Sequence, residues 1–171
     1  MKQIKVSKLT LNIGAGKDTN RLEKGLVLLE KISGAKPVKT ITQKRIQGWG
    51  LRPGVPVGCK VTLRKDKARK LFARLLYARD NKLNEDQIDT NGNLAFGIPE
   101  YIDIQDMEYI PEIGITGLEV CITLERSGFR IKRRKIMKRK IPKSHKIDKA
   151  EAIEFLKKEF NVQFEEKEDE L

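Results

Sequence analysis

The sequence predicts an α+β fold, an antiparallel sheet with helices packed on one face and an open polar face on the other. Strand-like segments outnumber the connections that suit parallel crossovers, amphipathic helical segments lie between them, and no internal repeat is visible. With 171 residues and 39% hydrophobic content, the chain suits a core domain over residues 1–125. Residues 126–171 form a basic segment, a short helix and an acidic tail, expected to pack on that domain or to extend it.

The amino-terminal part begins with a half-buried strand over residues 8–13. Its apolar residues alternate with polar ones, so one set faces the core (Leu9, Leu11 and Ile13) and the other faces away (Lys8, Thr10 and Asn12). After the turn at residues 14–16, helical spacing of leucines predicts a helix over residues 20–33. Asn20 and Glu23 offer capping chemistry at its start, and Gly34 supplies a stop.

The middle of the chain contains two further strands and a second helix. Residues 38–42 and 59–63 read as strands, the second of which places Lys60 and Thr62 on the open face, and a loop rich in glycine and proline covers residues 43–58. Asp66 opens a helix that ends near Asn81. Three of its residues are expected in the core: Leu71, Phe72 and Leu75.

The remaining elements are a strand pair and a final helix. Asn91–Gly92–Asn93 is a turn signal before a strand over residues 94–96, and residues 118–125 form the clearest strand of the chain. Residues 101–117 have room for a loop or short strand that the pattern does not place. Asp148 starts an amphipathic helix with Ile153, Leu156 and Phe160 on one stripe, and the acidic end, residues 165–170, is expected to fray.

The charge distribution indicates a polyanionic partner. The chain carries 36 Lys and Arg against 24 Asp and Glu, a net charge of +12, and residues 126–146 contain eleven of the basic residues and no acid. Such an unpaired cluster opposes compact folding unless phosphates neutralise it, and nucleic acid is the commonest such partner. The alternative is a solvated or disordered tail.

Several classes of protein lack the residues they would need. Cys59 and Cys121 read as core residues, and with the single His145 they make neither a zinc site nor a disulfide framework, which fits a reduced cytoplasmic interior. The longest aliphatic run, residues 26–29, is too short to cross a bilayer. A phosphate-binding loop at residues 14–19 fails, because Leu11 stands where a glycine is required and Asp18 where a hydroxyl is required.

No catalytic set is visible either. The acidic residues Asp103, Asp106, Glu108 and Glu112 could in principle hold magnesium for a nuclease, but nothing at fixed spacing supplies a nucleophile or a general base, so a solvated loop is the preferred interpretation. We therefore predict a protein without enzymatic activity, metal or cofactor.

Two surfaces could bind RNA. The only tryptophan, Trp49, lies in a stretch with four glycines and two prolines, flanked by Lys44, Arg45 and Arg52. An exposed indole there would stack on an unpaired base, and the alternative is an indole that folds back into the core. The open face could hydrogen-bond ribose and phosphate, and the alternative is an ordinary hydrated sheet face.

Five segments, in this order and spacing, resemble one known family. They are residues 9–16, 34–37, 48–52, 56–64 and 92–98. Together they are similar to protein five of the large ribosomal subunit, a universal family of 5S rRNA-binding ribosomal proteins. The basic segment followed by a short helix resembles the archaeal form.

This resemblance implies a non-catalytic protein of the central protuberance, located in cytoplasmic ribosomes, that binds 5S rRNA, large-subunit rRNA and the P-site tRNA. Neighbouring ribosomal proteins are further implied partners, with the small-subunit head as an additional candidate. The family's 5S rRNA contacts transfer to Asn12, Lys36 and Thr62, beside Lys8, Thr10 and Lys60 of the same face. The loop that meets tRNA transfers to Gly48, Trp49, Gly50, Leu51 and Arg52.

The basic segment is expected to contact the rRNA backbone through eight residues: Arg130, Lys132, Arg133, Arg134, Lys135, Lys138, Arg139 and Lys140. Many family members have glutamine where this chain has Ala35, which puts one hydrogen bond of the sheet-face network in doubt. A free-standing RNA-binding regulator, or an enzyme that acts on RNA, is the alternative function. Co-sedimentation with large subunits would separate the two.

Overall fold

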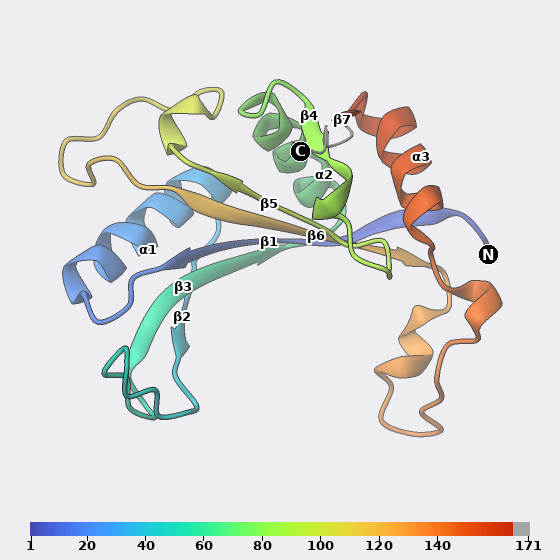
Figure 1. Ribbon diagram of the computed structural model, residues 1–171, viewed down its shortest axis with the longest axis horizontal. Coiled ribbons are helices and arrows are strands. Elements are labelled where there is room, and N and C mark those ends of the chain that lie inside the picture. Colours follow the sequence, from blue (N-terminus) through green and yellow to red (C-terminus); the bar gives the residue numbers. More distant parts are fainter. Residues whose placement is uncertain (166–171) are drawn as a thin grey trace, which may run out of the picture.

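Within residues 1–165, a five-stranded antiparallel sheet and three α-helices make up most of the fold, which confirms the predicted α+β class (Figure 1). The computed structural model describes residues 1–165, so the predicted fraying of the acidic end lies almost entirely outside the described residues. The sheet order is β2-β3-β1-β6-β5. Its strands are β1 (Ile4–Gly14), β2 (Val38–Ile41), β3 (Pro56–Leu63), β5 (Leu94–Ile98) and β6 (Leu118–Arg126).

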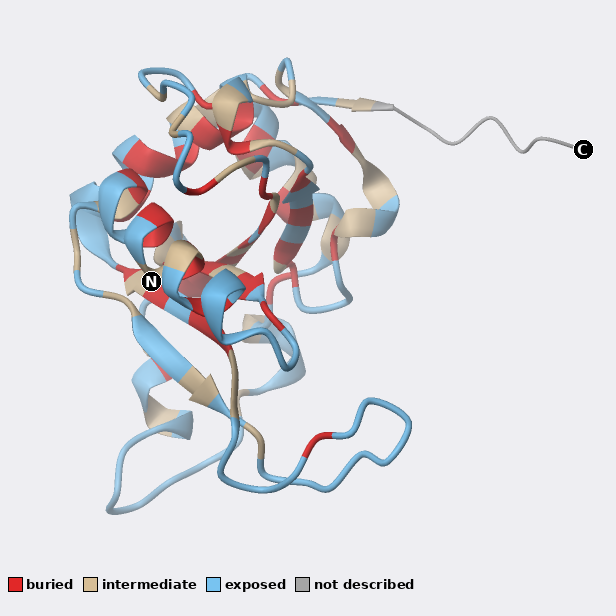
Figure 2. Ribbon diagram, turned by 90° about the vertical axis from the view of Figure 1, so that its left-hand side faces the viewer, coloured by how far each residue is buried: buried red, intermediate tan, exposed pale blue. Residues whose placement is uncertain are grey.

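The core lies between this sheet and the helices α1 (Thr19–Ser33), α2 (Lys65–Tyr77) and α3 (Lys149–Phe160). Figure 2 shows buried residues concentrated there. On the central strand β1, Leu9, Leu11 and Ile13 are buried as the alternation predicts. Leu9 and Leu11 pair with residues of both β3 and β6, and Ile13 pairs with Cys59 of β3. The sheet and helix faces thus bury one continuous apolar cluster that also includes residues near the carboxyl end.

Helix α1 has the predicted length but not the predicted start signal. Asp18, rather than Asn20, is the N-cap, and its carboxylate accepts hydrogen bonds from the backbone N–H groups of Asn20 (2.9 Å) and Arg21 (3.2 Å). A carboxylate at this position also faces the positive end of the helix dipole. Gly34 ends the helix in a left-handed conformation (φ 61°), as predicted.

Helix α2 buries Leu71, Phe72 and Leu75 as predicted, but it ends at Tyr77 instead of near Asn81. Asp80 and Asn81 both adopt positive φ, and the Asn81 N–H reaches back to the Leu76 carbonyl at 3.0 Å. These left-handed residues stop the helix and lead into β4 (Lys82–Asn84).

Strand β4 pairs in parallel with β7 (Gln163–Glu165) and forms a second, two-stranded sheet that the sequence pattern did not indicate. Three-residue strands carry too few positions for period-2 alternation to show. Helix α3 lies between β4 and β7 in the sequence and begins as predicted after Asp148, where a capping box joins Asp148 and Glu151. Leu156 is buried, and the Phe160 ring meets Phe72 edge-on at 4.8 Å between centroids.

Residues 101–117, which the pattern left unplaced, contain a short 3-10 helix, Tyr101–Asp103, and a loop. Tyr101 is fully buried, and its hydroxyl accepts a hydrogen bond from the Ile110 N–H at 2.8 Å. Three more 3-10 helices are Glu85–Gln87, Phe129–Lys132 and Lys143–His145. Among the described residues, no helix combines the length and apolar character needed to cross a bilayer.

Candidate nucleic-acid interface

The sheet face opposite the helices carries rows of short polar side chains. Strand pairing sets Asn12 beside Lys60 and Thr10 beside Thr62, while Lys8 pairs with Thr123 of β6. Directly paired residues of an antiparallel sheet point to the same face. Because Leu9 and Leu11 are buried on the helix side, the five predicted face residues of β1 and β3 lie together on the other side, where all are half-buried or exposed.

Lys36 is not part of this grid of paired residues. It is exposed in the connection between α1 and β2, two residues before Val38, which pairs with Lys60. Lys36 therefore stands at the β2 edge of the face and not among the strands. Ala35, next to it, is half-buried and packs against the core.

An acid that was not among the predicted face residues also lies on this face. Glu119 of β6 pairs with Asn12, and its Oε2 accepts a hydrogen bond from Asn12 Nδ2 at 3.1 Å. Side chains alternate between the two faces of a strand, so residues 119, 121 and 123 of β6 point away from the helices. The same alternation that identified the buried residues of β6 could therefore have placed Glu119 on the polar face. The hydrogen bond uses one Asn12 N–H donor, and the side-chain oxygen keeps its capacity to accept hydrogen bonds.

Cys121 also belongs to the outward phase, so its assignment to the core is wrong. It pairs with Thr10 and is half-buried, whereas Cys59 is fully buried as predicted. Burial raises the pKa of the Cys59 thiol to about 11. Burial, together with the nearby Glu119 carboxylate, also raises the pKa of Cys121, with a smaller opposing effect from Lys8. Both thiols are therefore protonated at neutral pH and are poor nucleophiles.

A cavity of about 580 Å³, lined in part by Asn12, adds two cations that were not among the predicted site residues. Arg21 of α1 and Arg79, which follows α2, line it together with Glu119. The Arg79 Nε is buried and has no hydrogen-bond partner within residues 1–165. The end of the face next to Asn12 is therefore flanked by guanidinium groups that can donate to phosphate oxygens.

The glycine-rich loop forms a narrow arm and is not irregular throughout. The N–H and carbonyl of Ile46 bond the carbonyl and N–H of Leu51 at 3.1 and 3.0 Å, and the Gly50 N–H donates to the Gln47 carbonyl at 2.8 Å. These bonds make a tight turn over residues 47–50. Strand β3 starts at Pro56, so the predicted loop 43–58 is three residues shorter at its end.

The tip of this arm presents the tryptophan. Trp49 is 69% exposed, which confirms the prediction that it does not fold back into the core. Gly48, Gly50 and Arg52 are also exposed, but Leu51 is buried, with 6% of its surface exposed. The Lys17 side chain lies against Gly50, close enough that a Cβ there would overlap its ammonium group.

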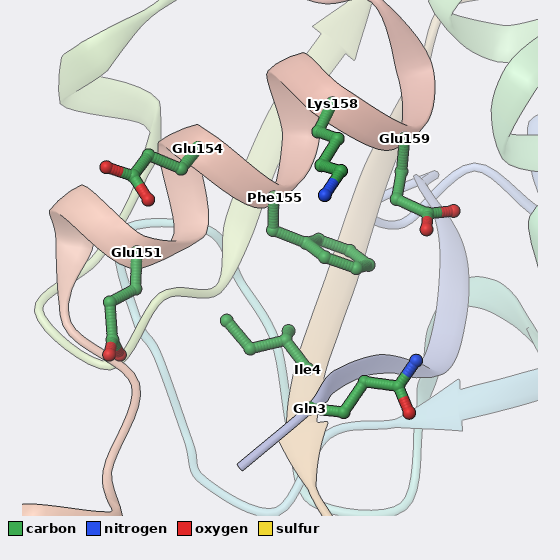
Figure 3. A pocket seen from close by; sticks show the side chains of 7 residues that line it. All are labelled: Gln3, Ile4, Glu151, Glu154, Phe155, Lys158 and Glu159. Carbon is green, nitrogen blue, oxygen red and sulfur yellow. The ribbon is translucent and has the colours of Figure 1, made fainter.

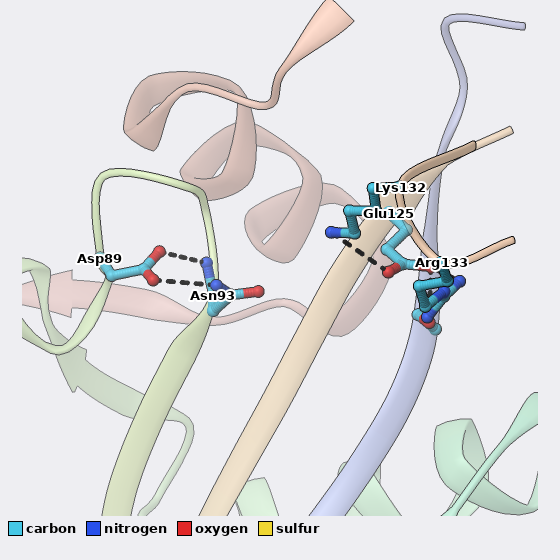
Figure 4. A network of polar contacts seen from close by, with 6 residues as sticks. Asp89, Asn93, Glu125, Lys132 and Arg133 are labelled. Atoms are coloured by element: carbon cyan, nitrogen blue, oxygen red, sulfur yellow. Dashed lines mark hydrogen bonds and ion pairs between the residues drawn. The ribbon is translucent and has the colours of Figure 1, made fainter. Parts of the chain in front are cut away.

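The basic segment folds back on the domain, although the sequence suggested an unpaired cluster. Arg126 is 8% exposed and donates to Glu151 of α3 at 2.6 Å and to the Lys146 carbonyl at 3.0 Å. Glu125, just before the segment, accepts a hydrogen bond from Arg133 at 2.8 Å and lies 3.7 Å from the Lys132 ammonium (Figure 4). The expectation of an unpaired cluster is therefore wrong for Arg126, Lys132 and Arg133.

The other predicted backbone contacts remain on the surface. All eight predicted residues from 130 to 140 are exposed, and within the described part of the chain only Lys132 and Arg133 of these eight form ion pairs. Arg134 donates from Nε to the Met137 carbonyl at 2.8 Å, which shapes the tip of the segment. The surface cations are thus displayed on a folded loop and not on a disordered tail.

Figure 1 shows how these parts are arranged. The arm between β2 and β3 and the basic segment after β6 both project below the sheet, at its two ends. The polar face lies between these two projections. An RNA bound to the face could therefore meet cationic groups on both sides.

A groove on the other side of the molecule has the opposite charge. Figure 3 shows its lining side chains between the start of β1 and α3. The volume of the groove is about 350 Å³. Its lining includes Glu151, Glu154 and Glu159 against the single cation Lys158. This groove does not suit a polyanion. Within residues 1–165, no group of three or more histidine, cysteine, aspartate or glutamate side chains could hold a metal ion.

Comparison with known proteins identifies close relatives. Residues 1–52 match the family described as ribosomal protein L5, and residues 56–164 match the model of that ribosomal family's C-terminus. The large ribosomal subunit protein uL5 of Nanoarchaeum equitans is 44% identical over 164 residues, covering 95% of this chain and 96% of the relative. The uL5 proteins of Sulfurisphaera tokodaii and Thermoplasma volcanium are 45% and 44% identical, each over 163 residues, covering 95% of this chain and 92% and 96% of the relative.

Proposed function

The chain belongs to the ribosomal protein L5 family, a family of non-enzymatic proteins of the large ribosomal subunit, and on that premise we propose that it binds 5S rRNA through the polar face of its sheet. The contacting residues are Asn12, Lys36 and Thr62, with Lys8, Thr10 and Lys60 around them. The basic segment then holds large-subunit rRNA in the central protuberance, and the arm at residues 48–52 touches the P-site tRNA. Neighbouring ribosomal proteins, and the small-subunit head, are the remaining proposed partners.

The observation that carries this proposal is the pairing of Thr10 with Thr62 and of Asn12 with Lys60 on the face opposite the helices. Hydroxyl and amide groups on a rigid sheet can both donate to phosphate oxygens and exchange hydrogen bonds with ribose 2′-hydroxyls. Strands also hold them at fixed spacing, so such a face reads the shape of a folded RNA. Loop residues could not fix that spacing as well.

The two projections support the second and third parts of the proposal. Cations on the folded basic segment supply salt-dependent affinity for phosphates, without reading sequence. The exposed indole of Trp49, next to the exposed Arg52, suits an unpaired base or the exposed bases of a tRNA. Leu51 contributes to this contact through the backbone and the shape of the arm, because its side chain is buried.

Binding to 5S rRNA and to an unrelated structured RNA of equal length, each titrated across salt, tests the first part. We expect wild-type protein to prefer 5S rRNA at all salt concentrations, and Asn12→Ala to reduce that preference. Asn20→Ala, a substitution of the same type at an exposed position of α1, is the matched control and should leave the preference unchanged. Equal affinity of wild-type protein for both RNAs would refute the proposal.

A second set of variants separates the specific recognition of 5S rRNA from non-specific electrostatic attraction to phosphates. Lys135, Lys138 and Arg139 are exposed and have no ion-pair partner among the described residues, so their replacement by glutamine should leave the fold intact. The triple variant should bind both RNAs more weakly and lower the slope of log affinity against log salt by about 2 to 3. The ratio of the two affinities should stay constant. A changed ratio with an unchanged slope would contradict this division of roles.

A further inference from the structure

A cavity of about 730 Å³ lies where the polar sheet face meets the folded basic segment. Its volume is within the range of about 300–1,000 Å³ that is typical of small-molecule sites. Two parts of the chain far apart in sequence build it. One wall comes from β1, β6 and the turn before β5, and the other comes from residues 129–147.

The first wall is a row of polar side chains from β1, β6 and the turn that leads into β5. Lys8 of β1 pairs directly with Thr123 of β6. Leu94 of β5 pairs with Ile122, so Asn93 stands beside Thr123 at the next position. An ammonium, a hydroxyl and an amide therefore line the cavity side by side.

Asn93 is held in one orientation. Its Nδ2 donates to Asp89 Oδ2 at 2.8 Å, and its backbone N–H donates to Asp89 Oδ1, also at 2.8 Å. A carboxylate can only accept, so the amide oxygen of Asn93 must lie on the side away from Asp89 (Figure 4). Burial alone would raise the pKa of Asp89, but the hydrogen bonds from Asn93 and Asn91 outweigh it and leave that pKa below its ordinary value.

The second wall combines cations with apolar groups. Lys140, Lys143 and Lys146 line it, and among the described residues none of these three forms an ion pair. Lys132 lines it too, 5.0 Å from the centre of the Phe129 ring. Phe129, Ile141 and Ile147 supply the apolar part of the lining, and no acid is among the lining residues.

The basic segment is fixed in this position by contacts at both of its ends. The Arg126 guanidinium bonds the Lys146 carbonyl, and His145 Nε2 donates to the Ser127 carbonyl at 2.9 Å. The His145 ring meets Phe129 edge-on at 5.6 Å. Since the ends of the segment are bonded to each other, the wall exists before any ligand binds, which lowers the entropic cost of binding.

The cavity combines cations, an amide oxygen and apolar side chains, and this combination suits an unpaired nucleotide better than a duplex. A duplex presents phosphates and covers its bases, so it would leave the apolar lining and the Asn93 oxygen unused. An unpaired nucleotide offers an apolar ring, polar ring edges with N–H donors, and a phosphate on each side. These groups match the apolar lining, the Asn93 oxygen and the lysines in turn.

We propose that this cavity receives one unpaired nucleotide of the bound rRNA, with its base between the Asn93 row and the apolar wall and its phosphates on the lysines. This inference rests on the proposed function, since it names the RNA feature that the two rRNA-binding surfaces hold jointly. The Asn93 oxygen accepts a hydrogen bond from the base. Lys143 and its neighbours hold the flanking phosphates.

Binding of the full chain to two single-stranded probes tests the proposal. One is an oligouridylate of five nucleotides, which stacks little and leaves its bases accessible, and the other is an abasic pentamer with the same sugar-phosphate backbone. Anisotropy gives the affinities, and NMR follows the side-chain amide of Asn93. We expect the base-containing probe to bind about threefold to tenfold more tightly, the range for one added hydrogen bond. The Asn93 resonance should shift with that probe only.

Variants with equal charge change locate the site. Lys143→Gln and Lys138→Gln each remove one cation from the same segment, but only Lys143 lines the cavity. We expect Lys143→Gln to weaken oligouridylate binding more than Lys138→Gln does. We expect Asn93→Ala to abolish the preference for the probe with bases. The wild-type NMR result needs no variant, so it holds even if Asn93→Ala disturbs the turn.

Three results would overturn the proposal. Equal affinity for both probes would make the cavity a simple anion site, and equal effects of the two lysine variants would mean diffuse attraction to the segment. An unshifted Asn93 resonance would place the base elsewhere. This test and the 5S rRNA test can fail separately. If wild-type protein shows no preference for 5S rRNA but the pentamer experiment gives the expected result, only the proposed function is refuted.

Discussion

Arg126 and Glu151 join the two ends of the basic segment. The Arg126 guanidinium, at the last residue of β6, donates to the Glu151 carboxylate in the first turn of α3 at 2.6 Å. The pair therefore turns a stretch with eleven basic residues and no acid of its own into a closed loop on the domain. This closed loop orders the cations for a polyanion, and the carboxylates of Glu151 and Glu125 offset part of their mutual repulsion.

Glu151→Gln should destabilise the fold by about 1 kcal/mol at neutral pH. Hydrogen bonds to charged groups contribute about 1.5–3 kcal/mol, and solvent screening reduces this value because the Glu151 side chain is 44% exposed. Glutamine can still accept the capping bond from the Asp148 N–H. Urea unfolding measures the change. Glu154→Gln, at an exposed position on the same helix, is the control and should have little effect.

The same pair predicts a pH dependence. The Arg126 hydrogen bond holds the pKa of Glu151 below its ordinary value of 4.5. A carboxylate with a lowered pKa stabilises the fold above its unfolded-state value, and this contribution is lost as pH falls through the folded-state pKa. The stability difference between wild type and Glu151→Gln should therefore be constant above about pH 5.5 and shrink below pH 4.5. A difference that grows on acidification would contradict the ion pair.

Gly92→Ala should cost more stability than Gly114→Ala, although both glycines have nearly the same positive φ, 74° and 73°. A Cβ on Gly92 would lie 2.8 Å from Ile147 Cγ2 and 3.2 Å from Ala152 Cβ, whereas nothing lies within 4 Å of a Cβ on Gly114. We expect about 1–2 kcal/mol from the left-handed backbone in both variants. Overpacking adds about 1–3 kcal/mol for Gly92 alone. Equal unfolding midpoints would show that α3 does not press on this turn.

Trp49→Ala should leave the free energy of unfolding within about 0.5 kcal/mol of wild type, because the indole is exposed at the tip of the arm. Its affinity for tRNA should fall by at least about fivefold, since stacking on a base contributes about 1–3 kcal/mol. Trp49→Phe keeps a ring and should retain part of that affinity. The single tryptophan is also a probe, and its fluorescence should be quenched by tRNA. Unchanged emission at saturating tRNA would remove the indole from the contact.

Glu119→Gln should raise the affinity for any RNA and lower the preference for 5S rRNA. The substitution removes a negative charge from the proposed binding face, so non-specific binding at low salt strengthens. It also replaces the carboxylate that fixes the Asn12 amide, which loosens the orientation of that side chain. Glu23→Gln, on the exposed surface of α1, is the control and should change neither quantity appreciably. A sharper 5S preference in Glu119→Gln would contradict the positioning role.

Much of the fold could be predicted because the spacing of apolar residues along the chain identifies most of its strands and helices. The alternation in residues 8–13 and 118–125 located β1 and β6, and leucines at helical spacing located α1. The sequence-based prediction was wrong where a strand was too short to show alternation, or where two nearby residues could both serve as the helix cap. The strands β4 and β7 have three residues each, and both Asp18 and Asn20 can cap a helix. Only the backbone path showed that Asp18 accepts the bonds.

The candidate site was predictable in part. The outward phase of β1 identified Lys8, Thr10 and Asn12, and the unusual composition of the arm indicated that Trp49 is exposed. Glu119 was not predicted, because the apolar residues that identify β6 are the buried ones at alternate positions and carry no signal about which outward side chains belong to the site. The cavity at Asn93 was not predictable at all. Its two walls come from segments whose approach depends on the ion pairs of Glu125 and Arg126.

By itself, the sequence determined the fold class, the main strands and helices, the positive charge of the segment after residue 125, and the motifs of its family. Each of these depends on residues near one another in the chain, where spacings of 2 and 3.6 residues decide which side chains share a face. The tertiary structure alone decided that Asn12 meets Glu119, 107 residues away, and that Glu151 neutralises Arg126. Such contacts depend on strand register and helix packing, which the whole core selects at once and no local pattern encodes.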